Sequence, residues 1–370
     1  MATSIIEHFS TLEDPRIERN KKHALTDIIV LSLCAVCSGA NGWEAIEEFG
    51  HEKLDWLRQY VPLKNGVPSH DCINYVLARL SAEGFRDCFL SWTRSVMKAC
   101  PGEIIALDGK TARGSRDAKH ERNPLHMVSA WACEQRLVLG QEAIDDKSNE
   151  ITALPKLLKL LEIKGCIVTI DAMGCQRAIA KQIIEQQGDY VFGLKGNQSQ
   201  LHEAVEDFFT TARHNNFRKV SYDYDETIEK DHGRLEIRRY WISDDLVTLN
   251  NTSAWSGLCS IGMVERECTQ AGSTSIEQRY FISSIKPEAP LFAKAVRSHW
   301  GVENPLHWRL DVILGDDASR VKKDNGAPIL TSLRHLCMNL FEQEPTKMSL
   351  AKKFRKAAWS DSFRSKVIFP

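Results

Sequence analysis

Two short apolar runs, each ending in an aspartate, constrain the fold of this chain most. Residues 103–107 (EIIAL) lead into Asp108, and residues 166–170 (CIVTI) lead into Asp171. Short apolar runs with polar ends predict buried strands. Neighbouring strands of one sheet would place the two aspartates side by side, where they repel each other unless a cation lies between them. The pair therefore predicts a divalent metal site.

The hydrophobic periodicity changes near Glu103. The first hundred residues have the pattern of successive helices, of which the apolar stretch 24–39 is one. After Glu103, short apolar runs alternate with helical segments, a pattern typical of an α/β protein. A hairpin at 127–144 is followed by strand and helix units. This order predicts an RNase H-like mixed sheet with flanking helices.

Residues 217–285 interrupt the alternation with three strand-like stretches and no helix signal, which predicts an inserted β subdomain. Helical patterns resume at Pro290. The sequence thus predicts three parts. An all-helical N-terminal domain covers 1–100, an RNase H-like domain with the insertion at about 217–285 covers 101–345, and a basic C-terminal tail covers 346–370.

The formal net charge of −1 argues against a protein that coats nucleic acid through its overall field. Any DNA-binding surface must therefore be local. Residues 318–370 contain 11 Lys and Arg against 4 Asp and Glu, and a second basic run covers 110–122. Each run is also explained as a solvated face of the protein.

No apolar run approaches the roughly 20 residues that span a bilayer, and the first residues lack the pattern of a signal peptide. We therefore expect a soluble, cytoplasmic protein with no membrane partner. The eleven cysteines lie mostly among apolar neighbours, as reduced core thiols do. Cys34 and Cys37 have the spacing of half a zinc site, but no second pair completes it, so we expect buried helix cysteines.

Five segments, in chain order, resemble those of the H-repeat-associated insertion-sequence transposases: IALDGKTARGS, VTIDAMGCQ, YVFGLKGNQ, DHGRLEIRRYWIS and HWGVENPLHWRLDV. The helical stretch 14–49, with 68–80, is similar to the N-terminal domain associated with that family. Residues 316–339 are similar to its C-terminal region. The resemblance covers nearly the whole chain.

The resemblance implies a DDE active site, in which Asp108 and Asp171 match the two aspartates and Glu303 matches the glutamate. Two Mg²⁺ or Mn²⁺ ions per site would divide the activation of the nucleophile and the stabilisation of the leaving oxygen. The reaction would be cleavage and strand transfer of insertion-sequence ends. The implied partners are double-stranded DNA, as terminal repeats and target, and a second copy of the chain on that DNA. The N-terminal domain would also bind DNA, and the DNA-bound protein would be associated with the nucleoid.

This assignment also predicts a geometry. Glu303 should be half-buried beside Asp108 and Asp171, with the three carboxyl groups within about 10 Å of one another, because two-metal sites share their ligands over such distances. Proline inside a helix removes a hydrogen bond and clashes with the preceding turn. Pro305 therefore predicts a helix start or a kink between Gly301 and Pro305.

The predicted DNA contacts are cationic and amide side chains near this site, in the β insertion and in the tail: Lys110, Arg113, Lys195, Asn197, His232, Arg234, Arg238, Arg297, His299, His307, Lys352, Lys353, Arg355 and Lys356. Those of the β insertion are equally explained as charges on an exposed strand. Lys195 and Asn197 are also explained as a strand-end turn, and Lys110 as a solvent-facing lysine.

The segment around Glu303 departs from the wider transposase group. That group's Tyr, Arg and Lys landmarks fall on Val296, His299 and Leu310, so their contacts do not carry over. Substitutes by position alone are Arg297, His307 and Arg309. Asp316 and Asp317 are predicted to end a helix or to support the metal ligands. Trp300 and Trp308 are predicted to be core residues, because large aromatic side chains near helices usually are.

Two other functions fit the same residues. One is a retired transposase that keeps the fold and binds DNA without catalysis. The other is an RNase H-like nuclease that acts on other DNA or RNA structures. The helical N-terminal domain and the long β insertion favour a transposase over a general nuclease.

Overall fold

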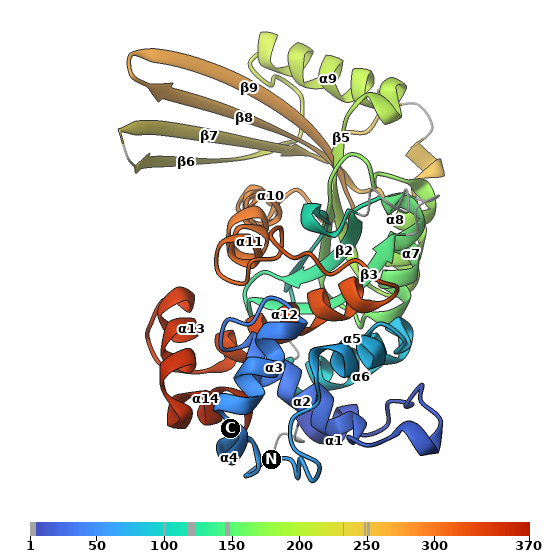
Figure 1. Ribbon diagram of the computed structural model, residues 1–370. Coiled ribbons are helices and arrows are strands. Elements are labelled where there is room, and N and C mark those ends of the chain that lie inside the picture. Colours follow the sequence, from blue (N-terminus) through green and yellow to red (C-terminus); the bar gives the residue numbers. More distant parts are fainter. Residues whose placement is uncertain are drawn as a thin grey trace. The chain divides into compact units, whose positions relative to one another are not determined.

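The computed structural model describes residues 5–98, 101–116, 123–144, 149–231, 233–247, 249 and 252–370. They divide into two units, each of which is discontinuous in the sequence. The first unit comprises 1–98, 109–149 and 303–370, and the second comprises 99–108 and 150–302. Figure 1 follows the chain through both units.

A mixed sheet runs through the described residues, with nine strands in the order β3-β2-β1-β4-β5-β9-β8-β7-β6. Its strands are β1 (Ile104–Ala112), β2 (Leu125–Ala132), β3 (Leu137–Ile144), β4 (Ile167–Ile170), β5 (Asp189–Leu194), β6 (Asp223–Asp231), β7 (Arg234–Ser243), β8 (Ser260–Gln270) and β9 (Ser273–Ser283). β4 pairs in parallel with both β1 and β5, whereas β2–β3, β5–β9 and the pairs from β6 to β9 are antiparallel. The mixed sheet predicted from the sequence is thus confirmed.

The first unit is built largely from helices. They are α1 (Ile5–Phe9), α2 (Leu25–Val36), α3 (Trp43–Glu52), α4 (Leu54–Leu57), α5 (His70–Leu77), α6 (Ala82–Val96), α11 (Arg309–Val312), α12 (Gly326–Gln343), α13 (Leu350–Trp359) and α14 (Asp361–Ile368). α2 is apolar all round, and eleven of its twelve residues are buried, as in a helix at the centre of a core. Cys34 and Cys37 are buried free thiols there, as predicted.

α12 joins the N-terminal helices to the sheet of the first unit. It contacts α2, α6 and β3. In β3, the backbone N–H of Val138 donates to Asn339 Oδ1 and its carbonyl accepts from Asn339 Nδ2, both at 2.8 Å. A side-chain amide can replace a strand partner in this way because it carries both a donor and an acceptor.

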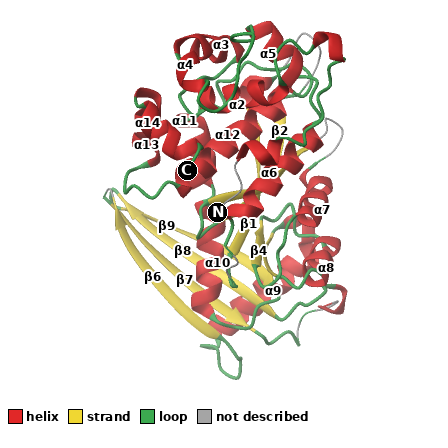
Figure 2. Cartoon of the chain, turned by 90° about the horizontal axis from the view of Figure 1, so that it is seen from below, coloured by secondary structure: helices red, strands yellow, loops and turns green. Residues whose placement is uncertain are grey.

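The helices of the described residues in the second unit are α7 (Glu150–Leu160), α8 (Arg177–Glu185), α9 (Ser199–His214) and α10 (Ala289–Gly301). The β insertion has four strands rather than the three expected, because residues 217–243 form both β6 and β7. Figure 2 shows β6–β9 as long neighbouring strands. α10 contacts β4 to β7, while α9 contacts β9. No helix of the described residues has both the length and the apolar content to cross a membrane.

The segment that carries Glu303 changes its helical geometry. α10 ends at Gly301, and Glu303–Trp308 form a π-helical segment that leads directly into α11. Pro305 lies inside this segment and has no N–H to donate. The predicted break between Gly301 and Pro305 is confirmed. Short π-helical segments within helices are frequent at functional sites.

Candidate active site

Asp108 and Asp171 lie at the same edge of the sheet within the second unit. The parallel register pairs Leu107 of β1 with Ile170 of β4, and the next residues along the two strands are the aspartates. Neighbouring strands are about 4.8 Å apart, and paired residues point to the same face. Both aspartates are half-buried, in contrast to the fully buried residues before them. The two aspartates therefore directly follow paired residues of two parallel strands. The prediction that the first strand ends at Asp108 is wrong, because β1 continues to Ala112, whereas β4 ends just before Asp171.

The loop after β4 orients Asp171. Its Oδ1 accepts hydrogen bonds from the backbone N–H of Met173 at 3.0 Å and of Gly174 at 3.3 Å. These bonds leave the carboxylate charge in place and make the residue part of a tight turn. The turn packs closely, because a Cβ on Gly174 would lie 2.2 Å from Cγ2 of Ile170. Asp171 is therefore a turn residue, and the same turn orients its second oxygen.

His299 of α10 lies beside this turn. Its Nδ1 is 3.1 Å from the hydroxyl of Thr169, two residues before Asp171. Burial lowers the pKa of His299 to about 4, although the negative charge of Asp171 opposes that shift. The ring is therefore neutral at physiological pH. The structure gives the His299 ring a contact with Thr169 of β4, and the predicted contact of His299 with DNA stays a prediction.

The turn after β5 lies next to the same loop. Asn197 Nδ2 donates to the carbonyl of Ala172 at 2.5 Å, which ties the β5 turn to the residue after Asp171. The strand-end turn proposed as the alternative for Asn197 is therefore present. Lys195 is exposed at the end of β5, so its side chain is accessible to a ligand.

Glu303 belongs to the first unit and is exposed, rather than half-buried as expected. Asp108 and Asp171 belong to the second unit. Among the described residues, no group of three or more His, Cys, Asp or Glu side chains is arranged to hold a metal ion. The paired aspartates by themselves offer hard oxygen ligands, which suit Mg²⁺ or Mn²⁺. The place of Glu303 as third ligand stays a prediction.

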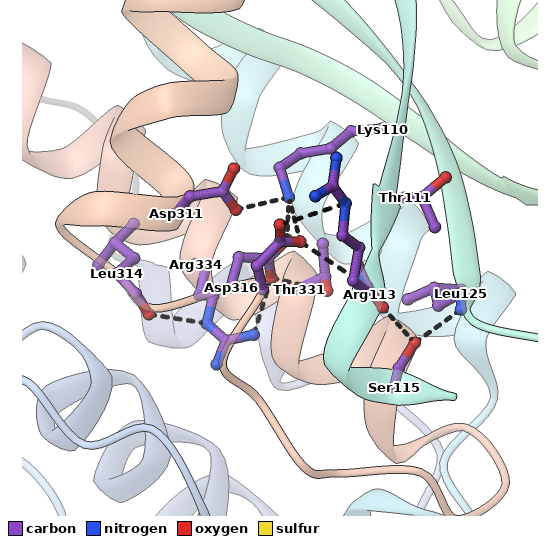
Figure 3. A network of polar contacts seen from close by, with 12 residues as sticks. Lys110, Thr111, Arg113, Ser115, Leu125, Asp311, Leu314, Asp316, Thr331 and Arg334 are labelled. Carbon is purple, nitrogen blue, oxygen red and sulfur yellow. Dashed lines mark hydrogen bonds and ion pairs between the residues drawn. The ribbon is translucent and has the colours of Figure 1, made fainter. Parts of the chain in front are cut away.

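Lys110 is an ion-pair residue rather than a free cation. Its Nζ lies 2.7 Å from Asp311, 3.0 Å from Asp316 and 3.3 Å from Asp317, all within the first unit (Figure 3). The predicted contact of Lys110 with DNA phosphate is therefore not supported. Arg113 is exposed, with Nε 3.8 Å from Asp317. No local pattern in the chain signals Asp311 as a partner of Lys110, because the two residues are remote in the sequence.

Most cations of the β insertion are also paired. Arg238 is buried and contacts Glu229 at 2.8 Å and Glu236 at 2.6 Å. Arg297 contacts Glu229 at 2.9 Å, and Arg234 contacts Glu236 at 3.2 Å. The predicted contact of Arg238 with DNA is not supported, since the guanidinium is largely buried and paired with two carboxylates. His232 lies outside the described residues.

The basic tail folds into two helices. Lys352, Arg355 and Lys356 are exposed on α13. Lys353 is buried, and its Nζ donates to the carbonyls of Phe341, at 2.9 Å, and of Glu344. Lys353 therefore stabilises the end of α12, and its predicted role in DNA binding is not supported.

Two tryptophans contradict the expected core packing. Trp300 is 42% exposed and Trp308 is 54% exposed. The Arg279 guanidinium lies 3.6 Å from the centroid of the Trp300 ring, as in a cation–π pair. His307 is half-buried.

This mixed sheet, with Asp108 on β1 and Asp171 directly after β4, has the arrangement of an RNase H-like domain. Residues 99–340 match the family described as "Transposase DDE domain", and residues 6–93 match the one described as "DDE_Tnp_1-associated". The chain belongs to the DDE transposase family. Membership supports a transposase function and implies DNA binding and the use of divalent metal ions.

Two relatives that match over almost the full length carry transposase names. The chain is 41% identical to the "H repeat-associated putative transposase YhhI" of Escherichia coli (strain K12), over 98% of this chain and 97% of that protein. It is 38% identical to the "Putative transposase YncI" of Escherichia coli O157:H7, over 99% of this chain and 94% of that protein. A shorter relative, "Inactive transposase YbfQ" of Escherichia coli (strain K12), is 47% identical over 20% of this chain and 89% of its own length.

Proposed function

We propose that this protein catalyses metal-dependent cleavage and strand transfer of the ends of an insertion sequence. Asp108, Asp171 and Glu303 would hold two Mg²⁺ or Mn²⁺ ions, which activate a water or a 3′-hydroxyl and stabilise the leaving oxygen. The observation that carries the proposal is the register of β1 and β4, which sets two half-buried aspartates opposite each other. The substrates would be terminal repeats and target DNA, bound at the nucleoid by two copies of the chain.

The chain's own residues have defined tasks in this proposal. The turn after β4 holds Asp171 through two backbone N–H groups, so that its carboxylate keeps one orientation. His299 stays neutral beside it and adds no positive charge that would compete with a cation. The π-helical segment presents Glu303 from an irregular turn rather than from a regular helix.

The proposal predicts that Asp108→Asn and Asp171→Asn each lower Mg²⁺-dependent nicking of a terminal-repeat DNA by at least about 1,000-fold, because an amide keeps the shape but removes the anionic ligand. Asp207→Asn, an exposed aspartate on α9, is the matched control and should keep parental activity. Nicking is measured on labelled DNA, with binding measured separately in Ca²⁺. Parental nicking by either site variant would contradict the assignment.

The retired-transposase alternative gives another result in the same experiment. It predicts that the parent protein binds terminal-repeat DNA but does not nick it in Mg²⁺ or Mn²⁺. Equal cleavage of unrelated branched DNA or of RNA in a hybrid would instead favour a general nuclease.

A further inference from the structure

Lys110 lies two residues beyond Asp108 in β1, at the centre of the network drawn in Figure 3. Its ammonium contacts the carboxylates of Asp311, Asp316 and Asp317 at 2.7, 3.0 and 3.3 Å. Only 11% of its side chain is exposed. These ion pairs are largely shielded from solvent, and the three aspartates share the one ammonium of Lys110.

Two of the three anions also lie near a second cation, Asp317 near Arg113 and Asp316 near Arg334. Asp316 is buried and also contacts Arg334 at 2.8 Å, and both side chains are 1% exposed. Burial opposes ionisation of Asp316, but Arg334 and Lys110 hold its pKa below the usual value. Within the part of the chain that the structure describes, the ion pair of Asp311 is with Lys110.

The backbone of the two connected segments is also in close contact. A Cβ on Gly114, just after β1, would lie 2.3 Å from the carbonyl oxygen of Ser319 and 2.6 Å from that of Asp317. The N–H of Arg113 donates to Asp317 Oδ1 at 3.2 Å. The end of β1 and residues 317–319 therefore pack closely, and a hydrogen bond connects them.

Asp311 belongs to α11, which continues directly from the π-helical segment that begins with Glu303. A contact that fixes the position of Asp311 therefore also restricts the movement of the helical segment that carries Glu303. On its other side, Arg309 of α11 contacts Glu342 of α12 at 2.6 Å. The contact between Lys110 and Asp311 connects this segment to β1.

We infer that Lys110 is a positioning residue: its ammonium holds the segment that carries Glu303 against β1, the strand that carries Asp108. The inference rests on the proposed function, because Glu303 matters only if it binds metal. Lys110 acts through the aspartates and touches neither DNA nor metal. Neighbours that hold metal ligands in place commonly change metal affinity or activity by about 10–100-fold when they are replaced.

The test uses the full chain with Lys110→Met, Lys110→Arg and Asp311→Asn. The Mg²⁺ concentration for half-maximal nicking, at saturating terminal-repeat DNA, should rise at least about 10-fold in Lys110→Met and Asp311→Asn. Lys110→Arg keeps the cation and should stay within about 3-fold of the parent. Arg86→Met is the matched control, since it removes an ion pair at 2.5 Å to Glu142 in the same unit, away from this network.

A second readout needs no metal and no activity. In the metal-free protein, amide hydrogen exchange at residues 109–113 and 309–317 should be at least about 10-fold faster in Lys110→Met than in the parent and in Arg86→Met. Parental exchange and parental Mg²⁺ dependence in folded Lys110→Met would overturn the inference. If exchange is faster in Lys110→Met but the parent protein does not nick DNA, the contact between Lys110 and the aspartates is supported and the proposed function is refuted.

Discussion

At the scale of single residues, burial distinguishes cationic side chains that stabilise the fold from exposed ones that are accessible to DNA. Lys352 and Lys353 are neighbours in a basic run, yet the first is exposed and the second is buried against two backbone carbonyls. The helical spacing of Leu350, Lys353 and Ala357, which are all buried, explains the difference. A helical projection of the tail would have identified Lys353 as the one lysine on the apolar face.

Lys353→Met should therefore destabilise the protein by about 1–3 kcal/mol, because it leaves carbonyls at the end of α12 without a donor. Lys352→Met should change the free energy of unfolding by less than about 0.5 kcal/mol. Urea denaturation followed by circular dichroism measures both. Equal stability of the two variants would show that the buried ammonium contributes nothing.

His335 on α12 makes folding sensitive to pH. The ring is buried, and burial lowers its pKa to about 3, below the 6.5 of a free histidine. Between these values the unfolded chain binds a proton that the folded chain does not, so stability falls as the pH is lowered. From pH 6.5 to 5, this histidine should account for a loss of about 1–2 kcal/mol. Urea denaturation of the parent and of His335→Gln should show a smaller loss in the variant. If the parent and His335→Gln lose the same stability as the pH is lowered, the loss comes from titratable groups other than His335.

At the scale of elements, the sequence predicts what depends on local periodicity and misses what depends on long-range contacts. The apolar runs before Asp108 and Asp171 could predict the two strands and their pairing, but not that β1 continues beyond Asp108 to Ala112. The partners of Lys110 could not be predicted, because Asp311 is brought to β1 only by tertiary packing. The polar Thr169 within an apolar strand was a usable signal for the contact with His299, since a buried hydroxyl needs a partner.

The contact between α12 and β3 tests such tertiary packing. Asn339→Leu keeps the approximate size but leaves the N–H and the carbonyl of Val138 buried without partners. Each unpaired group costs about 1–3 kcal/mol, so the loss of both should cost about 2–6 kcal/mol of stability. Amide exchange at Val138 should accelerate, whereas that of β9 should follow only the global change. Unchanged protection at Val138 would mean that water or backbone replaces the asparagine.

At the scale of the whole molecule, a net charge of −1 leaves DNA binding to local groups of cations. Many arginines and lysines are already paired with carboxylates, as Lys110 and Arg238 show. The exposed cations of α13 are accessible, so the predicted binding surface of the tail reduces to three residues, Lys352, Arg355 and Lys356.

Replacing these three residues together by Gln should weaken binding to terminal-repeat DNA and flatten its salt dependence. Each lysine or arginine that binds a phosphate releases condensed counterions, so the slope of log K against log salt falls by about 0.9 for each such residue removed. If all three bind phosphate, the slope should be smaller by about 2.7. The matched control replaces three exposed lysines outside the N-terminal domain, the β insertion and the tail, Lys156, Lys159 and Lys164, and should keep the parental slope. Fluorescence anisotropy between 50 and 200 mM salt, about the range over which such slopes are resolved, measures all three proteins. If the α13 variant keeps the parental affinity and slope, this helix is a solvated basic face, and DNA is bound by other residues of the chain.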